Sequence, residues 1–179
     1  MSVALDTMVL IWGGLRGDVL VGEDTDANAR EKRTKSVLLL RQLDARKETI
    51  IIPSIVVAEL LCPLEPHEHG KFVAALTQRF FCPSFDIHAA TIAAELFRYN
   101  KSLPVADQIR RQTLKSDIMI VATAKAAGAS VFYSNDSKCR KLATKVRLKA
   151  LDLPTHSENL FTDAEFKKGL PHKPIVGKP

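Results

Sequence analysis

The sequence predicts an α/β fold, in which helices cover a central, mainly parallel sheet of four to five strands. Short apolar segments rich in β-branched residues alternate along the chain with longer stretches of helical periodicity, a pattern typical of this class. The chain has 179 residues, of which 46% are hydrophobic, enough for one domain with a full core and short for two. We expect one domain over residues 1–152 and an extended or partly disordered tail over residues 153–179, whose prolines and glycines offer little to bury.

The first predicted strand covers residues 2–5, a brief apolar run that stops at Asp6. A glycine-rich segment, residues 13–28, separates it from the charged stretch 30–35. An amphipathic helix is predicted to continue from that stretch, with an apolar stripe formed by Val37, Leu40 and Leu43.

The second predicted strand covers residues 49–52 and stops at Pro53. Beyond it, Ser54 is a candidate N-cap for a helix that contains Glu59 and ends before Pro63. This arrangement places Glu59 in the first two turns of the helix, near the carboxyl end of the preceding strand.

Two further helices are predicted to be part of the scaffold. Phe72, Leu76 and Phe80 repeat at helical spacing, and Asp86 is expected to cap the helix that follows. We interpret these aromatic side chains as core rather than as a platform for nucleic-acid bases, because only 6% of the residues are aromatic.

The last predicted helix and strand carry two more acids. Ser116 is a candidate N-cap for a helix that begins at Asp117 and ends before Gly128, and a strand over residues 130–134 follows. A helix that leads into a parallel strand begins at the carboxyl edge of the sheet, so Asp117 is expected there. Asp136 reaches the same edge from the other direction, two residues beyond its strand.

Asp6, Glu59, Asp117 and Asp136 are therefore expected at one edge of the sheet, where ligand sites of open α/β folds collect. Carboxylates so close together raise one another's pKa, and a hard cation such as Mg²⁺ or Mn²⁺ resolves that conflict. The alternative is that each acid is only a helix cap or first-turn residue. That alternative is weakest for Glu59, which lies within the apolar run 55–61.

The same residues resemble the successive motifs of the PIN domain family, in the family's order and over roughly residues 1–152. The motifs are Leu5-Asp6-Thr7, Ala58-Glu59-Leu60, the stretch from Ser116 to Ala124, and Ser134-Asn135-Asp136. The family consists of metal-dependent ribonucleases built as three-layer α/β/α sandwiches, and many members are toxins of VapC-type toxin–antitoxin pairs. Segment 13–28 and the tail depart from the compact pattern of such toxins.

The resemblance implies an endoribonuclease that uses Mg²⁺ or Mn²⁺. Asp6, Asp117 and Asp136 would bind the ion, with Glu59 as a further ligand or as the residue that orients the attacking water. Ser134 matches the family's hydroxyl residue and would orient a carboxylate or a metal-bound water. The resemblance also implies two protein partners: an antitoxin, and a second copy of the chain in a homodimer.

Positive charge supports a nucleic-acid substrate. The net charge is +6, and a run of cations without an acid follows Asp136. The residues expected to contact RNA are Lys115, Lys138, Arg140, Lys141 and Lys145. Of these, Lys115 is expected on the opposite side of a groove, together with Lys101, Arg110 and Arg111. The alternative is a solvated helix face followed by a lysine-rich edge strand.

Other classes fit less well. A catalytically inactive PIN-like module that binds RNA remains the main competitor, although such modules usually lose one of the acids. A phosphatase would need a second aspartate in the motif that begins at Asp6, and a receiver domain would need a lysine at the end of a later strand; residues 6–8 and 130–136 supply neither. Asp24, Asp26 and Asn28 begin like a calcium loop, but Lys35 stands at the closing glutamate position.

Sequence features also bound the location of the protein. No apolar run approaches the ~20 residues that span a bilayer, so no membrane association is expected. The chain carries three cysteines, an odd number without metal-type spacing, and its amino terminus lacks a secretory signal. We therefore expect a cytoplasmic protein.

Overall fold

The computed structural model describes residues 1–15, 27–108 and 111–154. Its strands are β1 (Ser2–Leu5), β2 (Thr49–Ile51), β3 (Val131–Tyr133) and β4 (Lys149–Leu151). Its α-helices are α1 (Thr7–Trp12), α2 (Ala27–Ala45), α3 (Ser54–Leu61), α4 (Pro66–Arg79), α5 (Ile87–Ser102), α6 (Arg111–Ala126) and α7 (Ser137–Lys145). Most of segment 13–28 and almost all of the predicted tail lie outside the described residues.

The four strands form one parallel sheet in the order β2-β1-β3-β4. Val3 pairs with Ile50 on one side and with Val131 on the other. The chain moves from β1 outward to β2, and it moves from β3 outward in the opposite direction to β4. The direction of winding therefore reverses between β1 and β3, and the carboxyl ends of these two strands flank the crevice that such a reversal creates.

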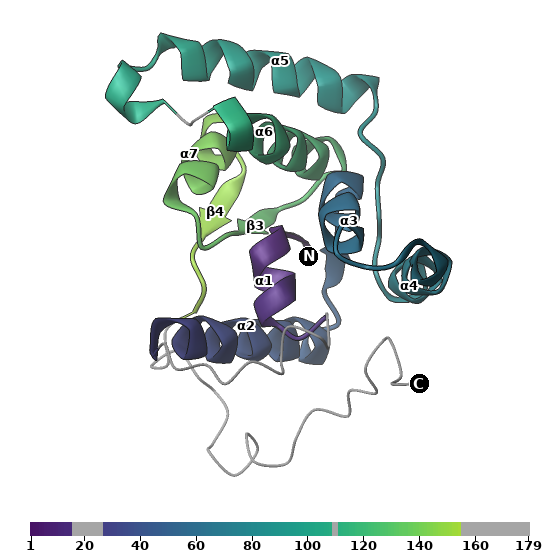
Figure 1. The fold of residues 1–179 in the computed structure, drawn as a ribbon. Helices are drawn as coiled ribbons and strands as arrows, with labels where there is room; N and C mark the ends of the chain where they lie inside the picture. Colours follow the sequence, from purple (N-terminus) through teal and green to yellow (C-terminus); the bar gives the residue numbers. More distant parts are fainter. Residues whose placement is uncertain (16–26, 109–110, 155–179) are drawn as a thin grey trace.

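The helices cover both faces of the sheet. Figure 1 shows α1 and α2 on one side of the strands and α6 and α7 on the other, with α5 packed outside α6. This is the arrangement that right-handed crossovers require when the winding direction reverses. The predicted α/β class with a three-layer sandwich is confirmed.

The apolar strands explain why the sheet is central. Val3, Ala4 and Leu5 have no exposed surface, and neither does Phe132 in β3. Helix α6 contributes Ile118, Val121 and other buried side chains to the same core, since its apolar residues lie on the side that faces the sheet. The sheet is therefore buried on both faces, as parallel sheets usually are.

The structure corrects two predicted helix starts. Helix α6 begins at Arg111, so Ser116 lies inside the helix and Asp117 lies in its second turn. Nothing in the polar stretch before Ser116 breaks a helix, so the helix extends backwards through it. Helix α3 begins at Ser54 with Pro53 as its N-cap residue, and the Ser54 hydroxyl instead accepts a hydrogen bond from the backbone N–H of Phe85 (3.2 Å).

Other local expectations are confirmed. Asp86 caps α5 by accepting a hydrogen bond from the backbone N–H of Ala89, and Gly128 follows α6 with a left-handed φ of 75°. Phe72, Leu76 and Phe80 are buried. Within the part of the chain that the structure describes, none of the helices combines the length and the apolarity that crossing a bilayer requires.

Candidate active site

Asp6 leaves the carboxyl end of β1 and becomes the N-cap of α1. One carboxylate oxygen, Oδ1, accepts a hydrogen bond from the backbone N–H of Thr7 at 2.8 Å. The other oxygen, Oδ2, accepts a hydrogen bond from the Ser134 hydroxyl at 2.7 Å. The two bonds fix the orientation of the carboxylate at the point where the winding direction of the sheet reverses.

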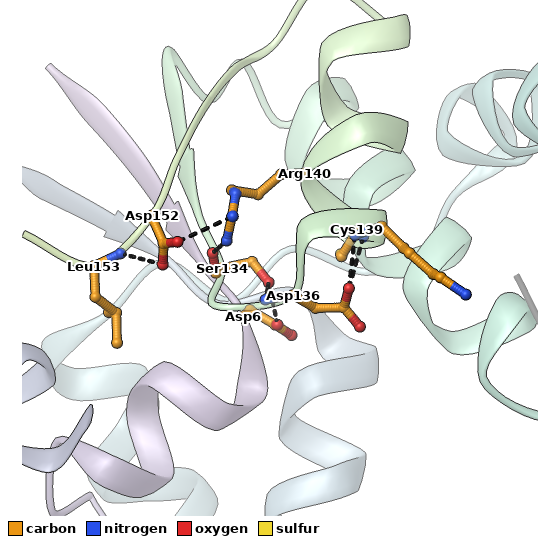
Figure 2. Close-up of polar contacts among 8 residues, drawn as sticks. Asp6, Ser134, Asp136, Cys139, Arg140, Asp152 and Leu153 are labelled. Atoms are coloured by element: carbon orange, nitrogen blue, oxygen red, sulfur yellow. Dashed lines mark hydrogen bonds and ion pairs between the residues drawn. The ribbon is translucent and has the colours of Figure 1, made fainter. Parts of the chain in front are cut away.

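Ser134 connects the ends of the two central strands. Its side chain is fully buried, and its Oγ also accepts a hydrogen bond from the backbone N–H of Asp136 at 3.0 Å. Asp136 is exposed and caps α7, where its Oδ1 accepts hydrogen bonds from the backbone N–H groups of Lys138 (2.7 Å) and Cys139 (3.4 Å). Figure 2 shows Asp6, Ser134 and Asp136 as one continuous polar cluster. Sequence reasoning expected Ser134 to orient a carboxylate, and it contacts that of Asp6.

Glu59 projects from α3 and is held by two hydroxyl groups. The Thr7 hydroxyl donates a hydrogen bond to one carboxylate oxygen, and the Ser116 hydroxyl donates to the other. The two donors come from α1 and α6, so Glu59 joins three helices. From the sequence, Ser116 is a candidate helix cap and Thr7 has no predicted role. The available signal was that each hydroxyl residue is the direct neighbour of an acid in the chain.

Asp117 differs from the other three acids. Within the described residues, no group donates a hydrogen bond to its carboxylate, which is only partly buried. Burial and, to a smaller extent, the negative charges of Asp6, Asp136 and Glu59 together raise the pKa of Asp117 from 3.8 to about 7. Burial likewise raises the pKa of Asp6, and the hydrogen bond from Ser134 opposes that increase. The four acids therefore share one electrostatic environment.

The chemistry of the four acidic side chains suits a divalent cation. Among the described residues, no group of three His, Cys, Asp or Glu side chains is already close enough to hold an ion together. Mg²⁺ does not require such a group, since proteins commonly bind it through one or two carboxylates with waters completing its octahedron. The ligand atoms are all oxygens, and no described group donates a hydrogen bond to Asp117 in competition with a cation. The residues present therefore fit a hard divalent ion.

The predicted basic residues have different surroundings. Arg140 is internally engaged: its guanidinium donates a hydrogen bond to the Ser134 carbonyl oxygen at 2.6 Å and forms an ion pair with Asp152 at 3.0 Å (Figure 2). Lys138, Lys141 and Lys145 are exposed on α7, and Lys115 is exposed on α6. The side chains of Arg110 and Arg111, expected opposite them, lie outside the described residues.

Comparison with known proteins identifies the family. The model of the PIN domain family matches residues 3–145. The chain belongs to the PIN domain family. The matched range includes all four acids and Ser134, so the resemblance based on the sequence motifs is confirmed. No curated protein sequence is significantly similar to the chain.

Two solved structures resemble this PIN domain. A chain in the crystal structure of VapBC2 from Rickettsia felis, bound to a DNA fragment from their promoter, aligns with a TM-score of 0.56 and 19% identity, covering 86% of this chain and 100% of that one. A chain in the DNA-bound VapBC of Salmonella typhimurium gives a TM-score of 0.48 and 16% identity, covering 86% and 99%. At 19% identity, the likeness to the Rickettsia felis chain shows a shared fold and nothing further.

Proposed function

We propose that this PIN domain is a metal-dependent endoribonuclease that hydrolyses phosphodiester bonds in RNA with Mg²⁺ or Mn²⁺. Membership of the family supports a nuclease at the coarse level. The single observation that carries the proposal is the placing of Asp117 beside Asp6, Glu59 and Asp136, where burial and these three charges raise its pKa to about 7. A charge cluster of this kind is unfavourable in a structural role and is typical of a site that binds a cation.

The side chains have distinct tasks in this proposal. Asp6, Asp117 and Asp136 hold the ion, and Glu59 is a further ligand or orients the attacking water. A bound divalent ion lowers the pKa of a water molecule and offsets the charge that develops on the phosphoryl oxygens. Ser134 keeps Asp6 in position through its 2.7 Å hydrogen bond. Asp117 must be ionised to act as a ligand, so ion binding below pH 7 is accompanied by release of a proton.

The positive charges give the substrate a place to bind. Lys115, Lys138, Lys141 and Lys145 are exposed and are available to the phosphate backbone of RNA. Arg140 was expected among these contacts, and in this proposal it acts indirectly, because Ser134 and Asp152 already hold its guanidinium.

Incubation of the purified protein with end-labelled single-stranded RNA tests the proposal. Cleavage is expected in Mn²⁺ or Mg²⁺ and is expected to stop when EDTA is added. RNA that is bound but stays intact in either ion would instead identify an inactive RNA-binding module.

We also propose that the chain is the toxin of a toxin–antitoxin pair and forms a homodimer. The similarity to chains of VapBC complexes supports an antitoxin as a partner. Expression of the wild-type chain in a bacterial host is expected to arrest growth, and Asp6→Asn is expected to relieve the arrest at equal expression. Light scattering of the purified protein tests the dimer, which a monomer mass at micromolar concentration would exclude.

A further inference from the structure

A pocket lies beside the acid cluster, between the carboxyl-terminal end of α5 and one face of α7. Its volume is about 800 Å³, within the range of roughly 300–1,000 Å³ that small-ligand sites occupy. One wall is formed by Tyr99, Asn100 and Leu103, and the other includes Lys138, Lys141 and Lys145. The pocket is therefore large enough for a nucleotide.

The charges of the pocket favour an anionic ligand. Lys138, Lys141 and Lys145 are three and four residues apart, so they lie along one face of α7. All three are exposed, and none has an ion-pair partner among the residues that the structure describes. None of the described residues that line the pocket is acidic. Three ammonium groups without a counter-charge attract phosphate oxygens.

The opposite wall supplies groups that suit a base or a ribose. Tyr99 is half-buried, and the Nζ of Lys145 lies 4.8 Å from the centre of its ring. Asn100 is buried, with 3% of its surface exposed, and it lines the pocket beside Tyr99. Aromatic faces stack on bases.

The pocket begins next to Asp136, the last acid of the cluster. Its lining residues Ser137 and Lys138 directly follow Asp136, and Lys138 donates its backbone N–H to the Asp136 carboxylate at 2.7 Å. Arg140 also lines the pocket while it holds the Ser134 carbonyl oxygen. A strand of RNA whose scissile phosphate lies at the acids would therefore meet this pocket with an adjacent nucleotide.

We propose that this pocket binds a nucleotide that flanks the scissile bond of the RNA. Its phosphate contacts Lys138 and Lys141, and its base or ribose lies against Tyr99 and Asn100. The assignment rests on the proposed function for its choice of RNA as the ligand. It goes further in placing a specific subsite on α5 and α7, with Tyr99 as the residue that distinguishes a nucleotide from other anions.

Binding of a short fluorescein-labelled oligouridine to the full chain in EDTA, followed by fluorescence anisotropy, tests the subsite without requiring cleavage. Lys141→Ala and Tyr99→Leu are each expected to weaken binding by about tenfold, and Tyr99→Phe is expected to bind like the wild type because it keeps the ring. Lys71→Ala is the matched charge control, since Lys71 is exposed on α4, at the other end of the fold from α7 (Figure 1). Each pocket lysine removed is expected to reduce the slope of log affinity against log salt by about 0.7.

The outcomes separate this subsite from the proposed function. Wild-type affinity in Lys141→Ala overturns the subsite, whether or not the chain cleaves RNA. Equal loss in Lys141→Ala and Lys71→Ala also overturns it, since only net charge would then matter. A poly-glutamate peptide is added as a competitor. If it displaces the RNA, and if its affinity is reduced by Lys141→Ala but not by Tyr99→Leu, the pocket binds an acidic protein segment and the nucleotide proposal is wrong. If the RNA binds in a way that depends on the pocket residues but is not cleaved in Mn²⁺, the proposed nuclease activity is wrong and the proposed nucleotide pocket is supported. Thermal unfolding identifies any variant that fails to fold. If Tyr99→Leu does not fold, Lys141→Ala, which changes an exposed residue, still tests the subsite.

Discussion

Asp117→Asn is expected to stabilise the metal-free protein at pH 8, because it removes a carboxylate whose ionisation is opposed by burial and by three neighbouring negative charges. The pKa of Asp117 is raised from 3.8 to about 7 in the folded chain. Between these pH values the folded state holds a proton that the unfolded state has lost, so the free energy of unfolding falls as the pH rises. Below pH 3.8 both states are protonated and this loss is absent. Above pH 7 both are ionised and the loss is complete.

The size of the effect follows from the shift. About three pH units at about 1.4 kcal/mol each correspond to about 4 kcal/mol. Asp117 is only partly buried, and solvent screening reduces this to about 2 kcal/mol of extra stability for the Asn variant at pH 8. At pH 5 most of the loss of stability that accumulates between pH 3.8 and pH 7 has not yet occurred, so the gain in stability of the Asn variant is expected to be less than half as large. No described group donates a hydrogen bond to Asp117, so the substitution removes no such contact.

Urea unfolding in EDTA at pH 5 and pH 8 measures both values. Asp44→Asn is the matched control, because Asp44 is exposed on α2 and its ion pair with Arg79 is long, at 3.5 Å. The control is expected to change the free energy of unfolding by less than about 0.5 kcal/mol at either pH. A gain for Asp117→Asn that is the same at both pH values, or a loss at pH 8, would refute the raised pKa of Asp117.

Three further predictions concern the hydrogen bonds around the acids. Ser134→Ala leaves the buried Asp6 oxygen without its donor, so we expect a loss of about 1–3 kcal/mol in urea unfolding and slower RNA cleavage; unchanged values in both assays would contradict the bridging role. Ser116→Ala removes one of two hydroxyls that hold Glu59, and we expect the cleavage rate to fall while Ser116→Thr retains it; equal rates for the two variants would show that this hydroxyl positions nothing. Arg140→Ala breaks the link between the loop after β3 and the end of β4, with an expected cost of about 1–2 kcal/mol; a cost below that of Lys71→Ala would be inconsistent with the contacts described.

The sheet and the approximate positions of the acids could be predicted because they depend on local patterns. The apolar run of β1 ends at Asp6, and the run of β3 is followed by Asp136, so strand periodicity alone places both at one edge. The capping alternative also proved true for these two residues, since both are N-caps. Capping and a place in the acid cluster are therefore compatible roles.

Contacts between distant segments could not be predicted in the same way. Glu59 was expected to be the acid most in need of a cation, because its helix is apolar. The structure shows instead that hydroxyl groups 52 and 57 residues away in the chain donate to it. Asp117 is the one acid of the four whose carboxylate has no hydrogen-bond donor among the described residues, and this difference depends on packing between α1, α3 and α6. The pairing of Arg140 with Asp152 likewise depends on where β4 ends. The division into residues 1–152 and a tail stays a prediction.

The central claim is that Asp6 binds the metal ion that is needed for RNA cleavage. Its most direct test compares the single-turnover cleavage rates of RNA by the wild type and by Asp6→Asn in saturating Mn²⁺. Asn can still accept the hydrogen bond from the Thr7 backbone, so α1 keeps its cap and a thermal unfolding curve close to that of the wild type is expected. The account predicts that the variant cleaves at least about 100-fold more slowly, since it loses a ligand and its charge at the ion. A folded Asp6→Asn variant that cleaves at the wild-type rate would contradict it.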